Sequence, residues 1–121
     1  MKPTHKNKAV KSISYYELLQ LISYDIKVKI VDVRDHIDYK KEHIKGAISL
    51  VLRELRERAY RLLNKHDTIV IYCSGFHCQA STKATKILLS LGYKNVFDYK
   101  GGLINYKRAN LPLEGYLHTT E

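Results

Sequence analysis

A regular alternation of short apolar runs with helical segments constrains this chain more than any other feature. The apolar runs are too short for helices, and β-branched residues dominate the clearest of them, as in buried strands. The predicted strands are residues 28–33, 47–50, 68–72 and 95–98. The predicted helices are residues 14–22, 37–43, 53–63, 81–91 and a last segment from 102 to near Pro112. This order predicts an α/β fold, with a central parallel sheet flanked by helices on both faces.

Length and cysteine content predict one domain in a reducing compartment. The 121 residues fit a single domain over residues 12–121, preceded by a flexible basic N-terminal arm over residues 1–11. The two cysteines, Cys73 and Cys78, do not form a disulfide framework. No apolar stretch follows the basic start of the chain, and none reaches the length of a bilayer span. We therefore expect a cytoplasmic protein without a membrane partner.

The charge balance restricts the class of partner. The chain has 21 basic and 12 acidic side chains, for a formal net charge of +9. The basic residues are spread along the chain and form no dense block interleaved with aromatic residues, which disfavours nucleic-acid binding. Attraction of a small anionic substrate or of an acidic protein partner explains the charge at least as well, and so does a solvated surface.

Cys73 is the strongest candidate for a catalytic residue. It directly follows the predicted strand 68–72 and precedes a small-polar segment and a helix. The thiol is therefore expected at the carboxyl edge of the sheet, facing a helix N-terminus whose free N–H groups favour an anion. We expect a lowered pKa for Cys73, and faster alkylation of Cys73 than of Cys78 near neutral pH. The alternative is an inert buried thiol.

The segment after Cys73 is predicted to be a substrate-binding loop, in which N–H groups converge on the thiol as an anion-binding nest. Gly75 supplies backbone freedom for the curl. Cys78 either resolves an intermediate by forming a disulfide with Cys73 or packs beneath the loop. A zinc site from these thiols with His66 and His77 lacks ligand pairs at finger-like spacing, so no metal is expected. The predicted loop is Ser74, Gly75, Phe76, His77, Cys78 and Gln79.

Three groups of residues, in order, resemble one known family. The first group runs from Asp32-Val33-Arg34 through Asp38-Tyr39 and His43-Ile44 to Gly46-Ala47-Ile48. The second group is Val70-Ile71-Tyr72-Cys73, with Leu91-Gly92-Tyr93 downstream. The third group is Gly101-Gly102-Leu103. In this arrangement, from about Ile13 to Leu113, the chain resembles the rhodanese-like domain. Glu42, Lys45 and Tyr106 depart from the family pattern, standing where Gly, Pro and Trp are common.

The resemblance implies a sulfurtransferase without a cofactor, in which Cys73 carries sulfane sulfur as a persulfide. The expected donor is thiosulfate or another small anionic sulfane compound, and the expected acceptor is cyanide or a thiol. The loop departs from the commonest family form, Cys-x-x-Gly-x-Arg-Ser, because Ala80 stands in the place of the arginine. It resembles a subgroup with a second cysteine, Cys-x-Gly-Pro-x-Cys-Asn. The missing guanidinium weakens the expectation that thiosulfate is the substrate, although His77 offers a hydrogen-bond donor to the sulfonate group.

Other interpretations remain open. Some proteins of this fold are phosphatases, but that chemistry needs an arginine six residues after the cysteine, where Gln79 stands. A module that only docks a partner protein, or relays sulfur to it, is the stronger rival. The remaining motif residues are expected to be structural: Asp32, Arg34, His43, Gly46, Gly101 and Gly102. Asp32 and Arg34 are expected to form an ion pair or side chain–backbone bonds. Tyr106 is expected to cap the core.

Overall fold

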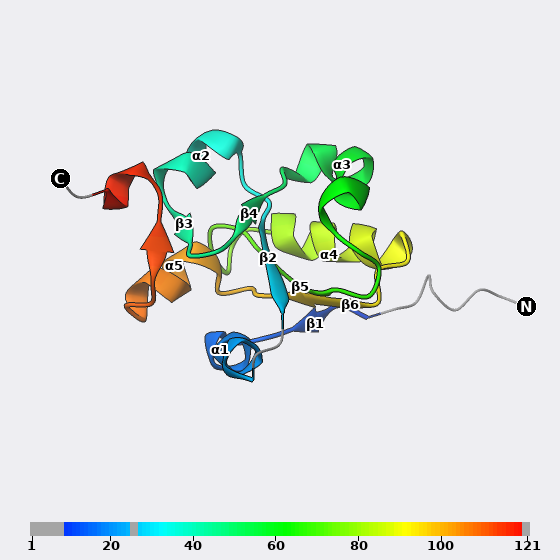
Figure 1. Cartoon of the computed structure of the whole chain (residues 1–121), viewed down its shortest axis with the longest axis horizontal. Helices are drawn as coiled ribbons and strands as arrows, with labels where there is room; N and C mark the ends of the chain where they lie inside the picture. The colour runs from blue at the N-terminus through cyan, green and yellow to red at the C-terminus, as the bar shows by residue number, and fades with distance from the viewer. Residues whose placement is uncertain (1–8, 25–26, 120–121) are drawn as a thin grey trace, which may run out of the picture.

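Five parallel strands form the central sheet of the molecule (Figure 1). The computed structural model describes residues 9–24 and 27–119. The strand order is β1-β6-β5-β2-β4, and all four pairings are parallel. The strands are β1 (Lys11–Ser12), β2 (Val28–Asp32), β4 (Ile48–Ser49), β5 (Thr68–Tyr72) and β6 (Asn95–Asp98).

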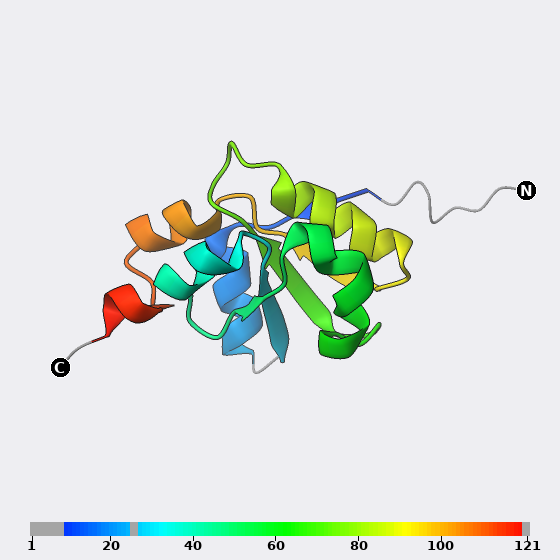
Figure 2. The same cartoon turned by 90° about the horizontal axis from the view of Figure 1, so that it is seen from above.

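Helices connect these strands and cover both faces of the sheet (Figures 1 and 2). They are α1 (Tyr15–Ser23), α2 (His36–Lys41), α3 (Leu55–Leu62), α4 (Ala80–Ser90) and α5 (Gly102–Arg108), with short 3-10 turns η2 (Leu52–Glu54) and η3 (Tyr116–His118). A separate antiparallel pair joins β3 (His43–Ile44) to β7 (Leu113–Glu114). No helix in the described ranges is long and apolar enough to cross a membrane.

The side chains of β5 alternate between two hydrophobic clusters. Ile69, Ile71 and Cys73 pack with residues of α3 and α4 on one face. Val70 and Tyr72 pack with residues of α1 and α5 on the other face. Because successive strand residues point to opposite faces, one buried strand carries both halves of the core. The carboxyl end of β5 is therefore held from both sides.

The sequence predicted the main elements, and the α/β fold with its parallel sheet is confirmed. The capping box at Ser14 is present, since Ser14 and Glu17 exchange side chain–backbone hydrogen bonds. The predicted helix 37–43 ends instead at Lys41, because Glu42 is extended and His43 pairs with Glu114 in β3.

The proposed boundary of the N-terminal arm also differs from the structure at its last residue. Lys11 pairs with Phe97 in β1, so it belongs to the sheet rather than to an arm. Residues 1–8 of the predicted arm lie outside the described residues.

Candidate active site

Cys73 lies where β5 ends and the loop of residues 74–79 begins. Its side chain is buried, with 1% of the residue surface exposed. The loop leads directly into α4, and the Cys78 N–H donates to the carbonyl oxygen of Gly75 over 3.0 Å to close a tight turn. The strand-end position places the thiol at the carboxyl edge of the parallel sheet, where ligands bind in folds of this type.

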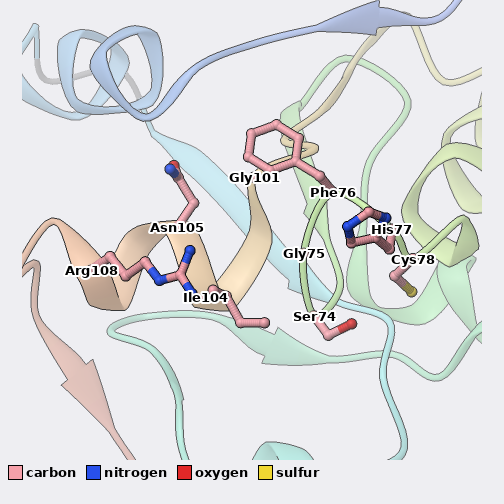
Figure 3. A pocket seen from close by; sticks show the side chains of 9 residues that line it. All are labelled: Ser74, Gly75, Phe76, His77, Cys78, Gly101, Ile104, Asn105 and Arg108. Atoms are coloured by element: carbon pink, nitrogen blue, oxygen red, sulfur yellow. The ribbon is translucent and has the colours of Figure 1, made fainter.

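A pocket of about 290 Å³ opens between this loop and one face of α5 (Figure 3). Cys73 does not line the pocket, whereas Cys78 does. Residues at positions 101, 104, 105 and 108 form the α5 side, because this spacing puts them on one helical face. The lining residues are Ser74, Gly75, Phe76, His77, Cys78, Gly101, Ile104, Asn105 and Arg108.

Helix α5 is attached to the loop through backbone contacts. The Leu103 N–H donates to the Cys73 carbonyl oxygen over 3.0 Å, and the Ile104 N–H donates to that of Ser74 over 2.9 Å. Gly102 has a φ of +61°, and a Cβ there would overlap the carbonyl oxygen of Cys73. Only glycine allows both this backbone conformation and this approach. The structural role predicted for Gly102 is therefore to let the start of α5 approach the Cys73 carbonyl oxygen.

The two thiols contact each other and differ in environment. Burial raises the pKa of the Cys73 thiol and Cys78 raises it further, although the Ser81 hydroxyl and N–H lower it in part. Burial also raises the pKa of Cys78, but hydrogen bonds from Cys73 and from the N–H groups of Ala80 and Ser74 outweigh it, so the pKa falls. The prediction of a lowered pKa for Cys73 is therefore wrong.

The position of the second sulfur explains this correction. The loop N–H groups were expected to act on Cys73, but those of Ser74 and Ala80 lower the pKa of Cys78. The loop thus places Cys78 near N–H groups that the sequence assigned to Cys73. For Cys73, the groups that lower the pKa are those of Ser81, and burial outweighs them.

Two further side chains fix the loop and had no sequence signal of their own. Lys100 Nζ donates to the Cys78 carbonyl oxygen and to Thr82 Oγ1, each over 3.2 Å. Ser81 Oγ is buried beside Cys73 and has no nitrogen or oxygen partner among the described residues. Arg108 was also missed, although its helical spacing from Gly101 and Ile104 is readable in the sequence.

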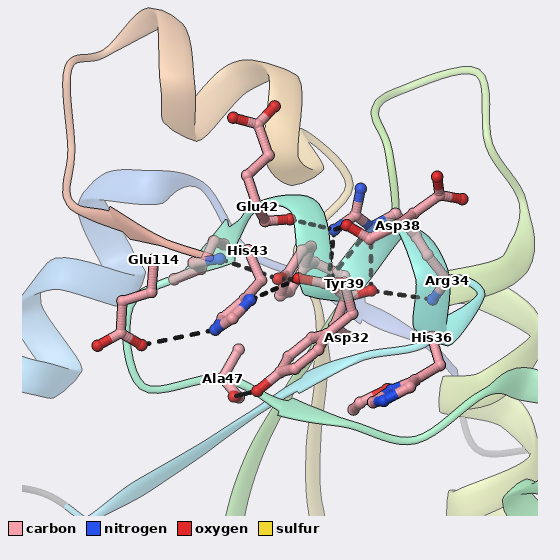
Figure 4. A network of polar contacts seen from close by, with 12 residues as sticks. Asp32, Arg34, His36, Asp38, Tyr39, Glu42, His43, Ala47 and Glu114 are labelled. Carbon is pink, nitrogen blue, oxygen red and sulfur yellow. Dashed lines mark hydrogen bonds and ion pairs between the residues drawn. The ribbon is translucent and has the colours of Figure 1, made fainter. Parts of the chain in front are cut away.

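Asp32 and Arg34 form a buried ion pair away from the pocket (Figure 4). Arg34 donates from Nε and Nη2 to both Asp32 carboxylate oxygens over 2.8 to 3.2 Å, and from Nη2 to the Glu42 carbonyl oxygen over 2.6 Å. Tyr72 Oη donates to Asp32 Oδ2 over 2.7 Å and accepts from the Ile44 N–H over 3.0 Å. This network ties β2, β5 and β3 together.

The other motif residues also lie in structural positions. His43 Nδ1 hydrogen-bonds the Tyr39 carbonyl oxygen over 2.6 Å, and its ring stacks on Tyr39 at 3.7 Å between centroids (Figure 4). Gly46 turns the chain with a φ of +86°. Tyr106 is buried and meets Tyr99 edge to face. Gln79 precedes α4 and does not line the pocket.

The described residues contain no group of three or more His, Cys, Asp or Glu side chains that could hold a metal ion. The groups present at this site are two thiols, loop N–H groups and the basic side chain of Arg108, with Lys100 bonded to the loop from outside the pocket. This combination suits an anion that reacts with sulfur.

The family of the chain follows from residues 14–109, which match the family model of the rhodanese-like domain. The chain belongs to this family. The YibN protein of Escherichia coli is 36% identical over 107 residues, which cover 86% of this chain and 72% of YibN. A tRNA uridine(34) hydroxylase of Hamiltonella defensa is 33% identical over 92% of this chain.

This rhodanese-like chain spans about a quarter to a third of the hydroxylases that it matches. The match covers 32% of the Hamiltonella defensa protein. A second hydroxylase, from Buchnera aphidicola, is 35% identical to this chain, and the match covers 65% of this chain and 26% of that protein. Among solved structures, the rhodanese-like domain of Anabaena Alr3790 has a TM-score of 0.81 at 28% identity, with 93% of this chain and 85% of that one covered.

A thiosulfate sulfurtransferase of Pseudomonas aeruginosa shares the fold, with a TM-score of 0.76. Its identity is 22%, and the match covers 88% of this rhodanese-like chain and 20% of that protein.

Proposed function

We propose that this rhodanese-like domain is a sulfurtransferase that carries sulfane sulfur as a persulfide on Cys73. The observation that carries the proposal is the place of this thiol, at the carboxyl end of β5 and beneath a loop that opens α4. The donor is thiosulfate or another small anionic sulfane compound. The acceptor is cyanide or a thiol, either free or on a protein partner with an acidic surface.

The contact between the thiols supplies a route for activating Cys73. Cys78 ionises before Cys73, so it is the unprotonated member of the pair and takes up the Cys73 proton as Cys73 attacks the donor. With thiosulfate, the Cys73 thiolate bonds to the outer sulfur, the bond to the sulfonate sulfur breaks, and sulfite leaves with the electron pair. The Ser81 N–H and the N-terminus of α4 stabilise the negative charge of the persulfide.

Arg108 supports an anionic donor. Its side chain runs along α5 toward Ile104 and the loop (Figure 3), and no carboxylate lines the pocket. Among the described residues, Arg108 forms no ion pair. Its guanidinium is thus available for a sulfonate-like group. It offers from α5 the charge that the commonest family loop carries at the position of Ala80.

Phosphoryl transfer is the weaker alternative. It needs positive charge fixed against the equatorial oxygens of the phosphoryl group, and the loop has Gln79 where the arginine would stand. Gln79 also lies outside the lining of the pocket. We therefore expect aryl-phosphate hydrolysis by the native chain to equal that of a Cys73→Ser variant.

The test of the proposal is thiosulfate-dependent production of thiocyanate from cyanide. Cys73→Ser should lose essentially all of it while circular dichroism shows an unchanged fold, because a serine hydroxyl lacks thiolate chemistry. Cys78→Ser, the matched control in the same loop, should be slower but active, since cyanide attacks the outer sulfur directly. Full turnover by Cys73→Ser, or a Cys73-dependent phosphatase rate above the sulfur-transfer rate, would contradict the assignment.

A further inference from the structure

Of the two cysteines, Cys78 lines the pocket and Cys73 does not. Cys73 is 1% exposed and lies outside the pocket lining, whereas Cys78 is partly exposed and lines it. Cys78 therefore lies between the buried Cys73 thiol, which contacts its carbonyl oxygen, and the pocket that it lines. Both thiols are free, so the pair is in its reduced form.

The loop holds the two side chains against each other. The Cys73 thiol donates to the Cys78 carbonyl oxygen over 3.6 Å, and each cysteine shifts the pKa of the other, upward for Cys73 and downward for Cys78. Lys100 Nζ fixes the same carbonyl oxygen from outside, and the Cys78 N–H is held by Gly75. Because Cys73 Sγ already lies within hydrogen-bond distance of the Cys78 backbone, bond formation between the sulfurs requires side-chain rotation with an adjustment of the loop.

We propose that Cys78 resolves the Cys73 persulfide and releases its outer sulfur as sulfide, a step that rests on the proposed function. The proton that Cys78 took up passes to the outer sulfur of the persulfide, and the Cys78 thiolate so formed attacks Cys73 Sγ, the inner sulfur. A bond forms between the two cysteine sulfurs, the persulfide S–S bond breaks, and the outer sulfur leaves as HS⁻ with its proton and the electron pair. The sulfane sulfur is reduced and the two cysteines are oxidised, so no further oxidant is required.

The surroundings of Cys78 suit this role. The N–H groups of Ser74 and Ala80 lower the pKa of Cys78, so a larger fraction of it is thiolate near neutral pH. An acceptor in the pocket competes with Cys78 for the persulfide. With an acceptor, the outer sulfur is transferred, and without one it leaves as sulfide and the disulfide remains until an external thiol reduces it.

The experiment uses the full reduced chain under anaerobic conditions, with thiosulfate and without any acceptor or reductant. The native chain should release about one sulfide per chain, as the balanced step requires, and lose the mass of two hydrogens as a Cys73–Cys78 disulfide. Cys78→Ser and Cys78→Ala should each retain the mass of one added sulfur and release no sulfide. The native chain without thiosulfate is the control and should stay reduced.

Each result distinguishes this step from the proposed function. A stable persulfide on Cys73 of the native chain without sulfide release would overturn the resolving role and leave the proposed function intact. An added sulfur mapped to Cys78 by fragmentation would contradict both. Sulfide release by the Cys78 variants at the native rate would overturn the resolving role as well. No added sulfur and no disulfide in any chain would refute the proposed function, and with it this step.

Discussion

Two cysteines of one loop acquire opposite ionisation tendencies from their neighbours. Cys73 is enclosed by the core, and burial raises its pKa, whereas Cys78 lines the pocket, and Cys73 with the N–H groups of Ser74 and Ala80 lowers its pKa. Desolvation penalises the thiolate of both residues, and hydrogen bonds to sulfur favour it. The balance of these two effects, rather than the residue type, decides which thiol ionises first.

Alkylation should follow this order. A lowered pKa means that Cys78 becomes a thiolate at a lower pH than an ordinary thiol, which ionises near about 8.5, and a raised pKa delays Cys73 to a higher pH. Iodoacetamide labelling across pH, with fragmentation of the shared peptide, should therefore modify Cys78 first. In the denatured chain the difference should vanish. Faster labelling of Cys73 in the folded chain would contradict the loop arrangement.

The position of a site residue could be predicted from the sequence only where β5 determines it. The run before Cys73 places that thiol at the sheet edge, and the structure has it there. The place of Cys78 depends on how the loop folds, and that of Arg108 on how α5 packs against the loop. Both depend on contacts between distant segments, such as that of Leu103 with Cys73, which no local pattern encodes.

At the scale of elements, α5 and the loop after Cys73 are joined by backbone hydrogen bonds. Two backbone hydrogen bonds join the start of α5 to Cys73 and Ser74, and Gly102 permits their close approach. The helix face that lines the pocket is thereby held at a set position relative to the thiols. A change at this junction should alter both stability and catalysis.

Gly102→Ala should test this junction against a matched control. The positive φ costs about 1–2 kcal/mol for alanine, and overlap with the Cys73 carbonyl adds to this, for a total of about 3 kcal/mol or more. Gly46 has a φ of +86° and open space where a Cβ would stand, so Gly46→Ala should cost only about 1 kcal/mol. Urea denaturation measures both. Equal losses, with sulfur transfer preserved in Gly102→Ala, would show that the junction does not matter.

Elements with a clear period were predictable, whereas of the two-residue strands only β4 was predicted. The run from Thr68 to Tyr72 and the helix after Ala80 follow from β-branched content and helical spacing. Strands β1, β3 and β7 have two residues each, so they present no period. They exist because tertiary contacts bring a partner backbone alongside, as Phe97 does for Lys11.

Over the whole molecule, the net charge of +9 attracts anions from a distance, whereas Arg108 acts inside the pocket. Long-range attraction and binding inside the pocket predict different results when a single arginine is replaced by a neutral residue. A remote arginine contributes only to the long-range field, which salt screens. Arg56, exposed on α3 at the opposite face of the sheet from α5, offers the comparison.

Arg108→Gln should raise the KM for thiosulfate about tenfold with a smaller change in kcat, because a charge-assisted hydrogen bond contributes about 1.5 kcal/mol. Arg56→Gln removes the same charge and should change the KM less than about twofold, as expected for an exposed charge. Steady-state kinetics at about 0.15 M salt, where the Debye length is roughly 8 Å, measures both. Equal effects of the two substitutions would assign anion attraction to the overall field.

The bonds around the end of β5 have one more consequence. The carbonyl of Tyr72 accepts from the Val33 N–H over 3.1 Å, its hydroxyl is held by Asp32 and Ile44, and the carbonyl of Cys73 accepts from Leu103. The backbone on both sides of the thiol is thus immobilised when the chain folds. The entropy of orienting the nucleophile is lost at that stage, and donor binding does not have to supply it again.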